Sequence, residues 1–376
     1  RYIQFRNKIK EWYESRSEKQ PVIFQPYFSE FEDFGTGNFC FENEAAVDVI
    51  YEMIEQHIDR ERLIILNRHK VVKVTDFSER LASLDVVDLD NKVVNQVTGW
   101  MFIDASETGD LLSLCGIEYA TGRESQSETG EPHAPETAVN LNTEDYYYID
   151  PVTDIGTDAY EADLLKEKPS NDETAVKISL ETGSRRMKAV TKITEQDISA
   201  EFRHGPRARF FVDSVGIGYA LLTIFEPGSE NKPVIVQTKP FQIPYRAFIS
   251  PEYSNFIAGG QTIGTTFVAS TAYNTPSVQW MIGESAGEIA AFCAGYNLNT
   301  HELMNSGRDF RKFRNRLVIK NRIPIYWYDD VSVNDPVFAE AQLRPFYDPI
   351  FHKFMKTLHY PGDRRPRKMP PFPRNR

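Results

Sequence analysis

Two short apolar runs in this chain each end in a turn of small residues, and a long β-rich stretch separates them. The first run, residues 100–104, leads into the acidic turn 104–110, and the second, residues 256–258, is followed by Gly259-Gly260. Ligands of α/β sheets bind beyond the carboxyl ends of strands, where turns of this kind lie. The pattern therefore predicts an α/β domain that is split around a β-rich middle part.

Hydrophobic periodicity predicts the elements of the first hundred residues. A single apolar stripe indicates a helix over residues 43–58, with Asn43 as its N-cap. Residues 63–66 and 71–74 are β-rich and are expected to be strands. Residues 83–97 alternate well enough for two further strands joined by a turn.

The middle of the chain is strand-rich, and we expect a mainly antiparallel sheet there. A helix of small residues is expected over 278–294. The strand-like runs of the middle part are 176–180, 187–193, 208–225 and 233–249.

Composition excludes several classes of protein. Among the 376 residues, 41% are hydrophobic and 26% charged, which is typical of a packed globular protein. The net charge of −11 argues against a nucleic-acid partner. No run approaches the roughly 18–20 apolar residues of a membrane span, and no signal-peptide pattern occurs, so we expect a soluble, cytoplasmic protein. Cys40, Cys115 and Cys293 are too scattered for a metal site, and none is predicted.

Two short motifs each have two interpretations. Gly283–Gly287 matches the G-x-S-x-G pattern, in which a strand and a sharp turn would present Ser285 as a nucleophile. The same residues fit one continuous, closely packed helix better, because Glu284 and the flanking residues favour a helix. Gly216-Ile217-Gly218 resembles part of a dinucleotide fingerprint, but close packing of a strand explains these glycines better.

The acidic turn after residue 104 also has two interpretations. Backbone amides near Ser106 and Gly109 could meet a phosphate or the edge of a heterocycle. Alternatively, Asp104 or Ser106 caps a helix that begins near Leu111. Gly259-Gly260 is likewise either a tight turn or a place where a ligand approaches the backbone closely.

Several segments carry a family resemblance, which runs from residue 1 to about residue 343. The most specific is Asp104-Ala105-Ser106-Glu107-Thr108-Gly109-Asp110-Leu111-Leu112. The other segments are 115–119, 122–125, 130–136, 202–211, 213–216, 240–247, 255–260, 280–287 and 324–331. Together they resemble the FAD-dependent oxidoreductase family, the flavoproteins with two dinucleotide-binding folds that include xanthan-lyase-like members.

The resemblance implies an α/β fold in which an incomplete Rossmann-like FAD-binding domain is interleaved with a mainly antiparallel substrate or cap domain. The implied parts are residues 1–136 and 251–343 for the FAD-binding domain, 137–250 for the cap domain, and 344–376 for a Pro- and Arg-rich extension.

The resemblance also implies FAD as the cofactor. It places a strand, two turns and the start of a helix near Ile282-Gly283 around the flavin. A helix N-terminus there would favour a negatively charged reduced flavin. The implied FAD-binding residues are Val71, Val72, Asp104, Ala105, Ser106, Glu107, Gly109, Asp110, Gly259, Gly260, Ile282 and Gly283.

The implied activity is hydride transfer between a small organic substrate and the flavin. On the substrate side we expect Arg123, Glu131, His133 and Arg246, although each could be an ordinary surface or loop-anchoring residue. Two alternatives stay open. The chain could be a non-catalytic or partner-bound remnant of the flavoprotein fold, or a serine hydrolase that uses Ser285.

The chain departs from the family pattern in two places. The family opens with a strand, a G-x-G-x-x-G turn and a helix that hold the pyrophosphate, and no counterpart follows Arg1. We expect a preceding segment or a second chain to supply this unit. The segments after Gly218 and before Trp280 also lack the Asp, Arg and His residues expected there, which would remove acid–base groups.

Overall fold

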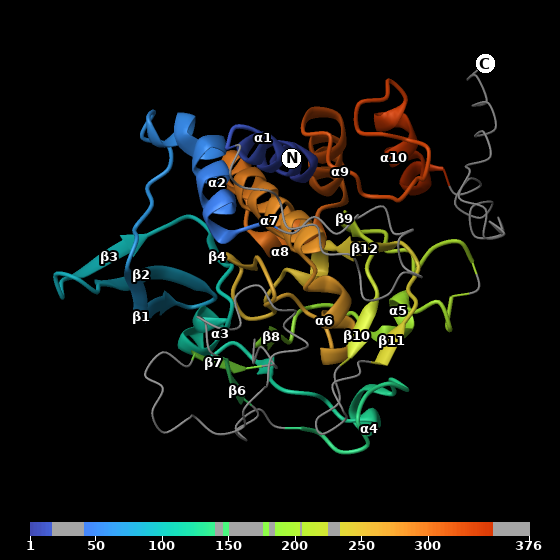
Figure 1. Ribbon diagram of the computed structural model, residues 1–376, viewed down its shortest axis with the longest axis horizontal. Coiled ribbons are helices and arrows are strands. Elements are labelled where there is room, and N and C mark those ends of the chain that lie inside the picture. Colours follow the sequence, from blue (N-terminus) through green and yellow to red (C-terminus); the bar gives the residue numbers. More distant parts are fainter. Residues whose placement is uncertain are drawn as a thin grey trace. The chain divides into compact units, whose positions relative to one another are not determined.

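The computed structural model describes most of the chain (Figure 1). The described residues are 1–16, 41–139, 185–203, 205–224 and 234–348, with the backbone of two short strands at 146–149 and 176–179. They form two compact units, which are treated separately. The smaller unit comprises residues 1–70 and 87–93, and the larger comprises residues 71–86 and the chain from residue 94.

Helices and strands are mixed along the described chain. The helices are α1 (Tyr2–Glu14), α2 (Asn43–Ile58), α3 (Asp110–Cys115), α4 (Gln126–Thr129), α5 (Glu195–Ile198), α6 (Phe267–Tyr273), α7 (Pro276–Tyr296), α8 (Thr300–Asn305), α9 (Gly307–Asn315) and α10 (Phe338–Tyr347), with the 3-10 turn η2 (Tyr245–Ala247) and the π-helical turn η3 (Arg316–Lys320). The strands are β1 (His69–Phe77), β2 (Arg80–Asp88), β3 (Val94–Thr98), β4 (Phe102–Asp104), β5 (Tyr119–Ala120), β6 (Tyr146–Ile149), β7 (Val176–Ser179), β8 (Arg186–Met187), β9 (Ser214–Gly218), β10 (Leu222–Ile224), β11 (Val234–Val236), β12 (Phe241–Pro244) and β13 (Phe256–Ala258).

The smaller unit is built on α1 and α2. Phe5, Ile9 and Trp12 are buried at intervals of three or four residues, so they form one face of α1. The indole Nε1 of Trp12 donates a 2.8 Å hydrogen bond to Oδ2 of Asp48 on α2. An apolar face and one side-chain hydrogen bond therefore hold α1 and α2 together.

The predicted elements of the first hundred residues are largely confirmed. The helix over 43–58 is α2, although its N-cap is Glu42 rather than Asn43 and no side chain caps it. The strand at 71–74 lies in β1, and β2 and β3 are the two strands predicted within 83–97. The strand predicted at 63–66 is wrong, because these residues form no strand.

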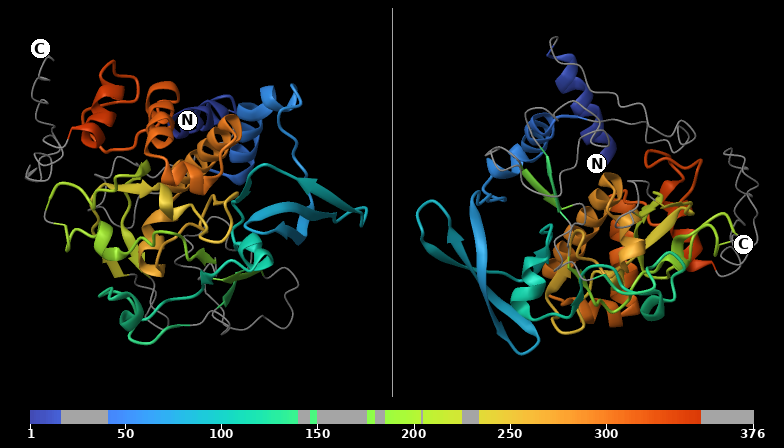
Figure 2. Two further views of the ribbon diagram at one scale, coloured as in Figure 1. Left: turned by 180° about the vertical axis from the view of Figure 1, so that it is seen from behind. Right: turned by 60° about the horizontal axis from the view of Figure 1, so that its bottom comes forward.

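Strand pairs of the larger unit are short. The pairs β5-β8, β6-β7, β9-β12 and β10-β11 are antiparallel, as expected for the middle of the chain, whereas β4 and β13 pair in parallel. Helix α7, orange in Figures 1 and 2, packs against β9, β4 and β13. This helix therefore connects the antiparallel and the parallel part of the unit.

Gly216 and Gly218 belong to β9, and they are required by close packing. A Cβ atom at Gly218 would lie 2.3 Å from Cε2 of Phe241 on β12, and one at Gly216 would lie 2.8 Å from Cγ of Met281 on α7. The interpretation of Gly216-Ile217-Gly218 as a closely packed strand is thus confirmed.

Ser285 lies in the middle of α7, which runs without a break from Pro276 to Tyr296. Its side chain is fully buried, and its Oγ donates a 3.0 Å hydrogen bond to the carbonyl oxygen of Val215. The strand and the sharp turn that a nucleophile elbow would need are both replaced by helix, as the helix expected over 278–294 predicted. The serine-hydrolase hypothesis is therefore wrong, and the continuous-helix interpretation is confirmed.

Helices and strands that are far apart along the chain together form the core of the larger unit. Phe102, Phe256 and Ile257 of the parallel pair belong to it, together with Ile282 and Ile289 of α7. None of the helices in the described part of the chain is long and apolar enough to cross a membrane.

Candidate functional site

The parallel strands β4 and β13 bring together the two turns that the sequence singles out. Their register runs from Phe102 opposite Phe256 to Asp104 opposite Ala258. The amide of Gly259 donates a 2.7 Å hydrogen bond to the carbonyl oxygen of Asp104. Because the strands are parallel, both turns leave the pair at the same edge, which is where α/β proteins place their ligands.

Asp104 organises the first turn through its buried carboxylate. Oδ1 accepts hydrogen bonds from the amide of Ser106 at 3.0 Å and from its hydroxyl at 2.6 Å, and Oδ2 accepts one from the amide of Leu111 at 3.1 Å. The hydroxyl of Ser106 in turn accepts from the amide of Asp110. Both side chains therefore cap the start of α3, as the second interpretation of this turn predicted. Ala105 and Glu107 are exposed on the same turn.

The outer part of this turn depends on Gly109. Its φ of +68° lies in the left-handed region that favours glycine. Arg185 Nη1 donates a 2.8 Å hydrogen bond to the carbonyl oxygen of Thr108 beside it. This contact ties the turn to the chain that leads into β8.

The second turn contains two glycines in different surroundings. A Cβ atom at Gly259 would lie 2.3 Å from Cγ2 of Ile103, so this glycine is required by the packing of the two strands. A Cβ atom at Gly260 would meet its nearest neighbours, atoms of Ala105 and Gln279, only at 3.6 Å. Gly260 is buried, and these are ordinary van der Waals distances, so packing alone does not require a glycine at this position.

Helix α7 begins earlier than the resemblance implied. Its first residue is Pro276, so the expectation of a helix start near Ile282-Gly283 is wrong. Ile282 is fully buried in the core and cannot present its side chain to a ligand. Gly283 nevertheless lies beside the second turn, since a Cβ atom there would meet only the carbonyl oxygen of Gly259, at 4.0 Å.

Gln261 and Thr262 continue the second turn. The hydroxyl of Thr262 donates a 2.9 Å hydrogen bond to the carbonyl oxygen of Asp104, which locks the two turns together. The side-chain oxygen of Gln261 is buried and has no hydrogen-bond partner within the described part of the chain. Because an unsatisfied buried acceptor is costly, this atom indicates a place for a ligand donor.

Val71 and Val72 lie apart from these turns in the strand order. They belong to β1 in the sheet β1-β2-β3, not to the β4-β13 pair. Val72 is 46% exposed. The structure thus assembles Asp104, Ala105, Gly259, Gly260 and Gly283, but does not join the two valines to them by strand pairing.

A cavity of about 550 Å³ in the larger unit is lined by several charged side chains. Its volume is typical of a small-molecule site. Cationic groups outnumber carboxylates in its wall, which favours an anionic ligand. The charged lining residues are Arg123, Arg186, Lys188, Lys192, Glu124 and Glu128.

Arg186 is the most deeply buried cation of this cavity. Its side chain is 2% exposed, and Nη2 donates to Oε2 of Glu124 at 2.9 Å and to the carbonyl oxygen of Gly122 at 2.7 Å. Burial lowers the pKa of Arg186, while the negative charge of Glu124 opposes this shift. The amide of Phe267 also donates to Glu124, so this ion pair holds the start of α6 in place.

Three polar atoms in the cavity wall are buried and have no hydrogen-bond partner among the residues that the structure describes. They are Nε of Arg186, Oε1 of Glu124 and Oγ1 of Thr265. Together they offer a ligand one charged donor, one charged acceptor and one hydroxyl. Arg123 lies beside them, 4% exposed, with its guanidinium 4.8 Å from the ring centre of Phe267.

Comparison with known proteins agrees with this geometry. The family model described as FAD dependent oxidoreductase matches residues 2–182 and 183–317. The chain belongs to the FAD-dependent oxidoreductase family. No curated protein and no solved structure matches it. FAD is accordingly the cofactor of this flavoprotein.

The residues at the strand ends fit such a cofactor. A dinucleotide requires turns at the carboxyl ends of parallel strands and positions where its atoms can approach the backbone. The parallel pair provides the turns, Gly283 leaves room beside the backbone, and Gly260 is a glycine that packing does not require. The partnerless oxygen of Gln261 adds a hydrogen-bond acceptor.

Two residues expected on the substrate side of the flavoprotein, Glu131 and His133, are joined through Glu195. Glu131 is 1% exposed and accepts hydrogen bonds from the amide of Glu195 at 2.6 Å and from the hydroxyl of Thr266 at 2.5 Å. Nδ1 of His133 lies 2.5 Å from Oε1 of Glu195. Ligand atoms of His133, Glu195 and Glu201 lie within 4.8 Å of one another, and His133 and Glu195 are in direct contact.

Arg246 lies elsewhere in the larger unit. Its backbone amide and its Nε both donate to Oδ2 of Asp213, at 3.1 and 2.9 Å. This hydrogen bonding raises the pKa of Arg246. The residue does not line the cavity around Arg186, so the structure does not bring it together with Arg123.

The buried carboxyl group of Glu131 should make the free energy of unfolding depend on pH. Burial raises its pKa above the ordinary 4.5, because the hydrogen bonds from Thr266 and the amide of Glu195 offset only part of that shift. The folded state therefore binds this proton more tightly than the unfolded chain. The resulting stabilisation is present below pH 4.5 and is lost as the pH rises through the folded pKa.

We expect Glu131→Gln to remove this dependence, since an amide does not titrate. Unfolding in urea, followed at several values between about pH 4 and pH 8, should show the wild type losing stability relative to the variant as the pH rises. The exposed Glu107→Gln is the control, with an unchanged profile. A constant difference between wild type and Glu131→Gln at every pH would contradict the prediction.

Sequence reasoning missed Arg186, Glu124 and Thr265 as site residues. Arg186 precedes the strand-like run at 187–193, and an arginine there usually faces solvent. Glu124 was part of the resemblance but carried no role. Arg123-Glu124, two adjacent opposite charges that follow Gly122, could have singled out Glu124 but not its partner Arg186.

Proposed function

We propose that this protein is an FAD-dependent oxidoreductase that transfers a hydride between flavin and a small organic substrate bearing an anionic group. The observation that carries the proposal is the parallel pairing of β4 and β13, which unites the turns at Asp104 and Gly259 in a chain that matches the family over most of its length. In this proposal the pair belongs to a Rossmann-like part interleaved with the antiparallel strand pairs.

The residues proposed to hold FAD are those of the two turns and α7. Asp104 keeps the first turn in shape through its three hydrogen bonds, while Ala105 and Glu107 present its outer side. Gly283 leaves the backbone accessible, Gly260 adds a glycine that packing does not require, and Gln261 Oε1 would accept a hydrogen bond. The flavin, when bound, supplies the hydride chemistry, which side chains alone cannot perform.

The cavity around Arg186 is proposed to hold the substrate. Arg186 Nε, with the cationic groups of Arg123, Lys188 and Lys192, is suited to a carboxylate or phosphate. Oε1 of Glu124 is suited to accept a hydrogen bond from a hydroxyl or amine of the same substrate. We therefore propose an alcohol or amine that also carries an acid group.

Glu131 and His133 then act as positioning residues in this proposal. Thr266, to which Glu131 is bound, is the N-cap of α6 and accepts a hydrogen bond from the amide of Ala269. Its neighbour Thr265 lines the cavity. A proton released from the substrate would be accepted by Glu124, since no histidine is among the residues that line the cavity within the described chain.

Gly260→Ala tests the cofactor side. Because a Cβ atom there meets only ordinary contacts at 3.6 Å, the fold should tolerate the change, whereas the added methyl group should hinder the approach of FAD. We expect the wild type, purified without added flavin, to show the visible absorption bands of oxidised flavin. The variant should lose them while its thermal unfolding temperature changes little.

Gly287→Ala, in the same helix as Gly283, is the matched control, because nothing lies within 4 Å of a Cβ atom there. It should keep its flavin and gain about 0.5–1 kcal/mol of stability. A wild-type protein that is colourless and takes up no added FAD would overturn the proposal and favour the non-catalytic alternative. A Gly260→Ala protein with full flavin content would remove Gly260 from the FAD site.

A further inference from the structure

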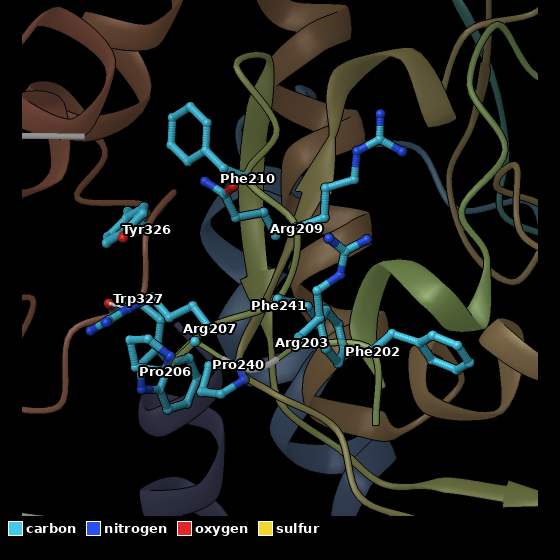
Figure 3. A pocket seen from close by; sticks show the side chains of 13 residues that line it. Phe202, Arg203, Pro206, Arg207, Arg209, Phe210, Pro240, Phe241, Tyr326 and Trp327 are labelled. Atoms are coloured by element: carbon cyan, nitrogen blue, oxygen red, sulfur yellow. Dashed lines mark hydrogen bonds between the residues drawn. The ribbon is translucent and has the colours of Figure 1, made fainter. Parts of the chain in front are cut away.

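A second cavity, of about 490 Å³, lies in the larger unit and shares none of its lining residues with the cavity around Arg186. Its wall is formed by residues 202–203 and 205–210, by the start of β12 and by Tyr326-Trp327. In Figure 3, Arg207, Pro206 and Trp327 gather on one side of it, and Arg203, Phe241 and Phe202 on the other. The function proposed above leaves this cavity unexplained.

The charged side chains among the described lining residues of this cavity are all cationic. They are Arg203, Arg207 and Arg209, and none of the described lining residues is acidic. Asp197 pairs with two of these arginines, at 3.0 Å from Arg209 and 3.6 Å from Arg203. The cavity therefore gathers positive charge in a chain whose net charge is −11.

The arginines keep part of their side chains accessible. Those of Arg209 and Arg203 are 54% and 32% exposed. Arg207 is fixed by a 2.6 Å hydrogen bond from its Nε to the carbonyl oxygen of Trp327 and by its position over the ring of Tyr326, at 5.2 Å. Guanidinium groups held in place in this way are suited to bind a carboxylate or phosphate.

Aromatic rings complete the wall. Phe210 lies with its ring centre 6.1 Å from that of Tyr326, and Trp327 packs edge-on against Tyr219 at 5.6 Å. Phe241, 1% exposed, contributes a buried ring. Rings of this kind contact a planar, apolar ligand group favourably, while the arginines select for a negative charge.

We propose that this cavity is a binding site for a small anion that carries a planar ring, such as an aromatic carboxylate or an aromatic phosphate ester. The inference goes beyond the proposed function and does not rest on it, because binding here requires neither FAD nor turnover. The volume of about 490 Å³ is sufficient for a ligand of this class.

Calorimetric titration of the full chain tests the proposal with 4-hydroxybenzoate and phenyl phosphate as probes, and with acetate and inorganic phosphate as their ringless counterparts. We expect saturable binding of at least one ringed probe, tighter than that of its ringless counterpart. Arg209→Met should weaken that binding about tenfold or more, as the loss of one charge-assisted hydrogen bond. The variant should fold, because Arg209 is half exposed and Asp197 keeps Arg203 as a partner.

Three further variants make the result decisive. Arg311→Met, at an exposed position on α9 over Tyr347, should leave binding unchanged. Lys192→Met in the other cavity should also leave it unchanged, whereas Trp327→Leu should abolish the preference for a ring. The proposal is overturned by the absence of saturable binding, by equal losses in Arg209→Met and Arg311→Met, or by a loss confined to Lys192→Met.

Discussion

Arg186→Met should lower the free energy of unfolding by about 3–5 kcal/mol, as expected when one partner of a buried ion pair is removed. Met has a similar length, so the change removes charge and hydrogen bonds rather than volume. It leaves the carboxylate of Glu124 buried beside a single amide donor, that of Phe267, and deprives the carbonyl oxygen of Gly122 of its partner. Urea titration at neutral pH measures the effect.

A double variant that also replaces Glu124 tests the ion pair more directly. Arg186→Met combined with Glu124→Gln should recover much of the loss, because replacing both charges removes the uncompensated carboxylate. Lys188→Met is the matched control, since Lys188 pairs with Glu118 at the surface, with side chains 60% and 69% exposed. It should cost under about 1 kcal/mol. Equal costs for Arg186→Met and Lys188→Met would show that the buried pair does not stabilise the fold.

Asp104→Ala should have the second-largest effect, on stability and on FAD together. The change removes both oxygens that accept from Ser106 and Leu111, and hydrogen bonds to charged groups contribute about 1.5–3 kcal/mol each. We expect a loss of about 3 kcal/mol or more, and a protein purified with little flavin. Urea titration and the flavin-to-protein absorbance ratio are the two measurements.

Asp104→Asn separates the contribution of the hydrogen bonds from Ser106 from that of the hydrogen bond from Leu111. It keeps one oxygen for Ser106 but turns an amide donor toward the amide of Leu111, so its loss should be intermediate. Glu107→Gln, exposed on the same turn, should change stability by less than about 0.5 kcal/mol. Full stability in Asp104→Ala would show that the turn forms without its carboxylate.

The sequence correctly predicts those helices and strands whose formation depends mainly on their own residues. The helix over 43–58 carries its apolar stripe within itself, and the strands 71–74 and 100–104 are confirmed within β1 and β4. The run 63–66 has equal β propensity but no strand, because a strand also needs a partner to pair with. Its hydrophobicity alone could not reveal whether such a partner exists.

The turns of the candidate site could be predicted from the sequence, but its ion pair could not. Gly259-Gly260 and Asp104–Asp110 stand out in the sequence as small-residue segments after strands. The ion pair between Arg186 and Glu124 joins positions 62 residues apart, and no local pattern reports such a contact. The residue pattern placed the helix over 278–294, within two residues of both ends of α7, whereas the resemblance put its start near Ile282-Gly283. Pro276 at the first helical position marks the observed start.

The β4-β13 pair also has a consequence for synthesis. Its two strands are about 150 residues apart along the chain, so at roughly 5–20 residues per second the second strand leaves the ribosome about 8–30 s after the first. Until then the carbonyl oxygen of Asp104 lacks the amide of Gly259 and the hydroxyl of Thr262. Nascent chains that end before β13 therefore expose an unpaired strand edge, and they depend on chaperones for longer than the finished protein does.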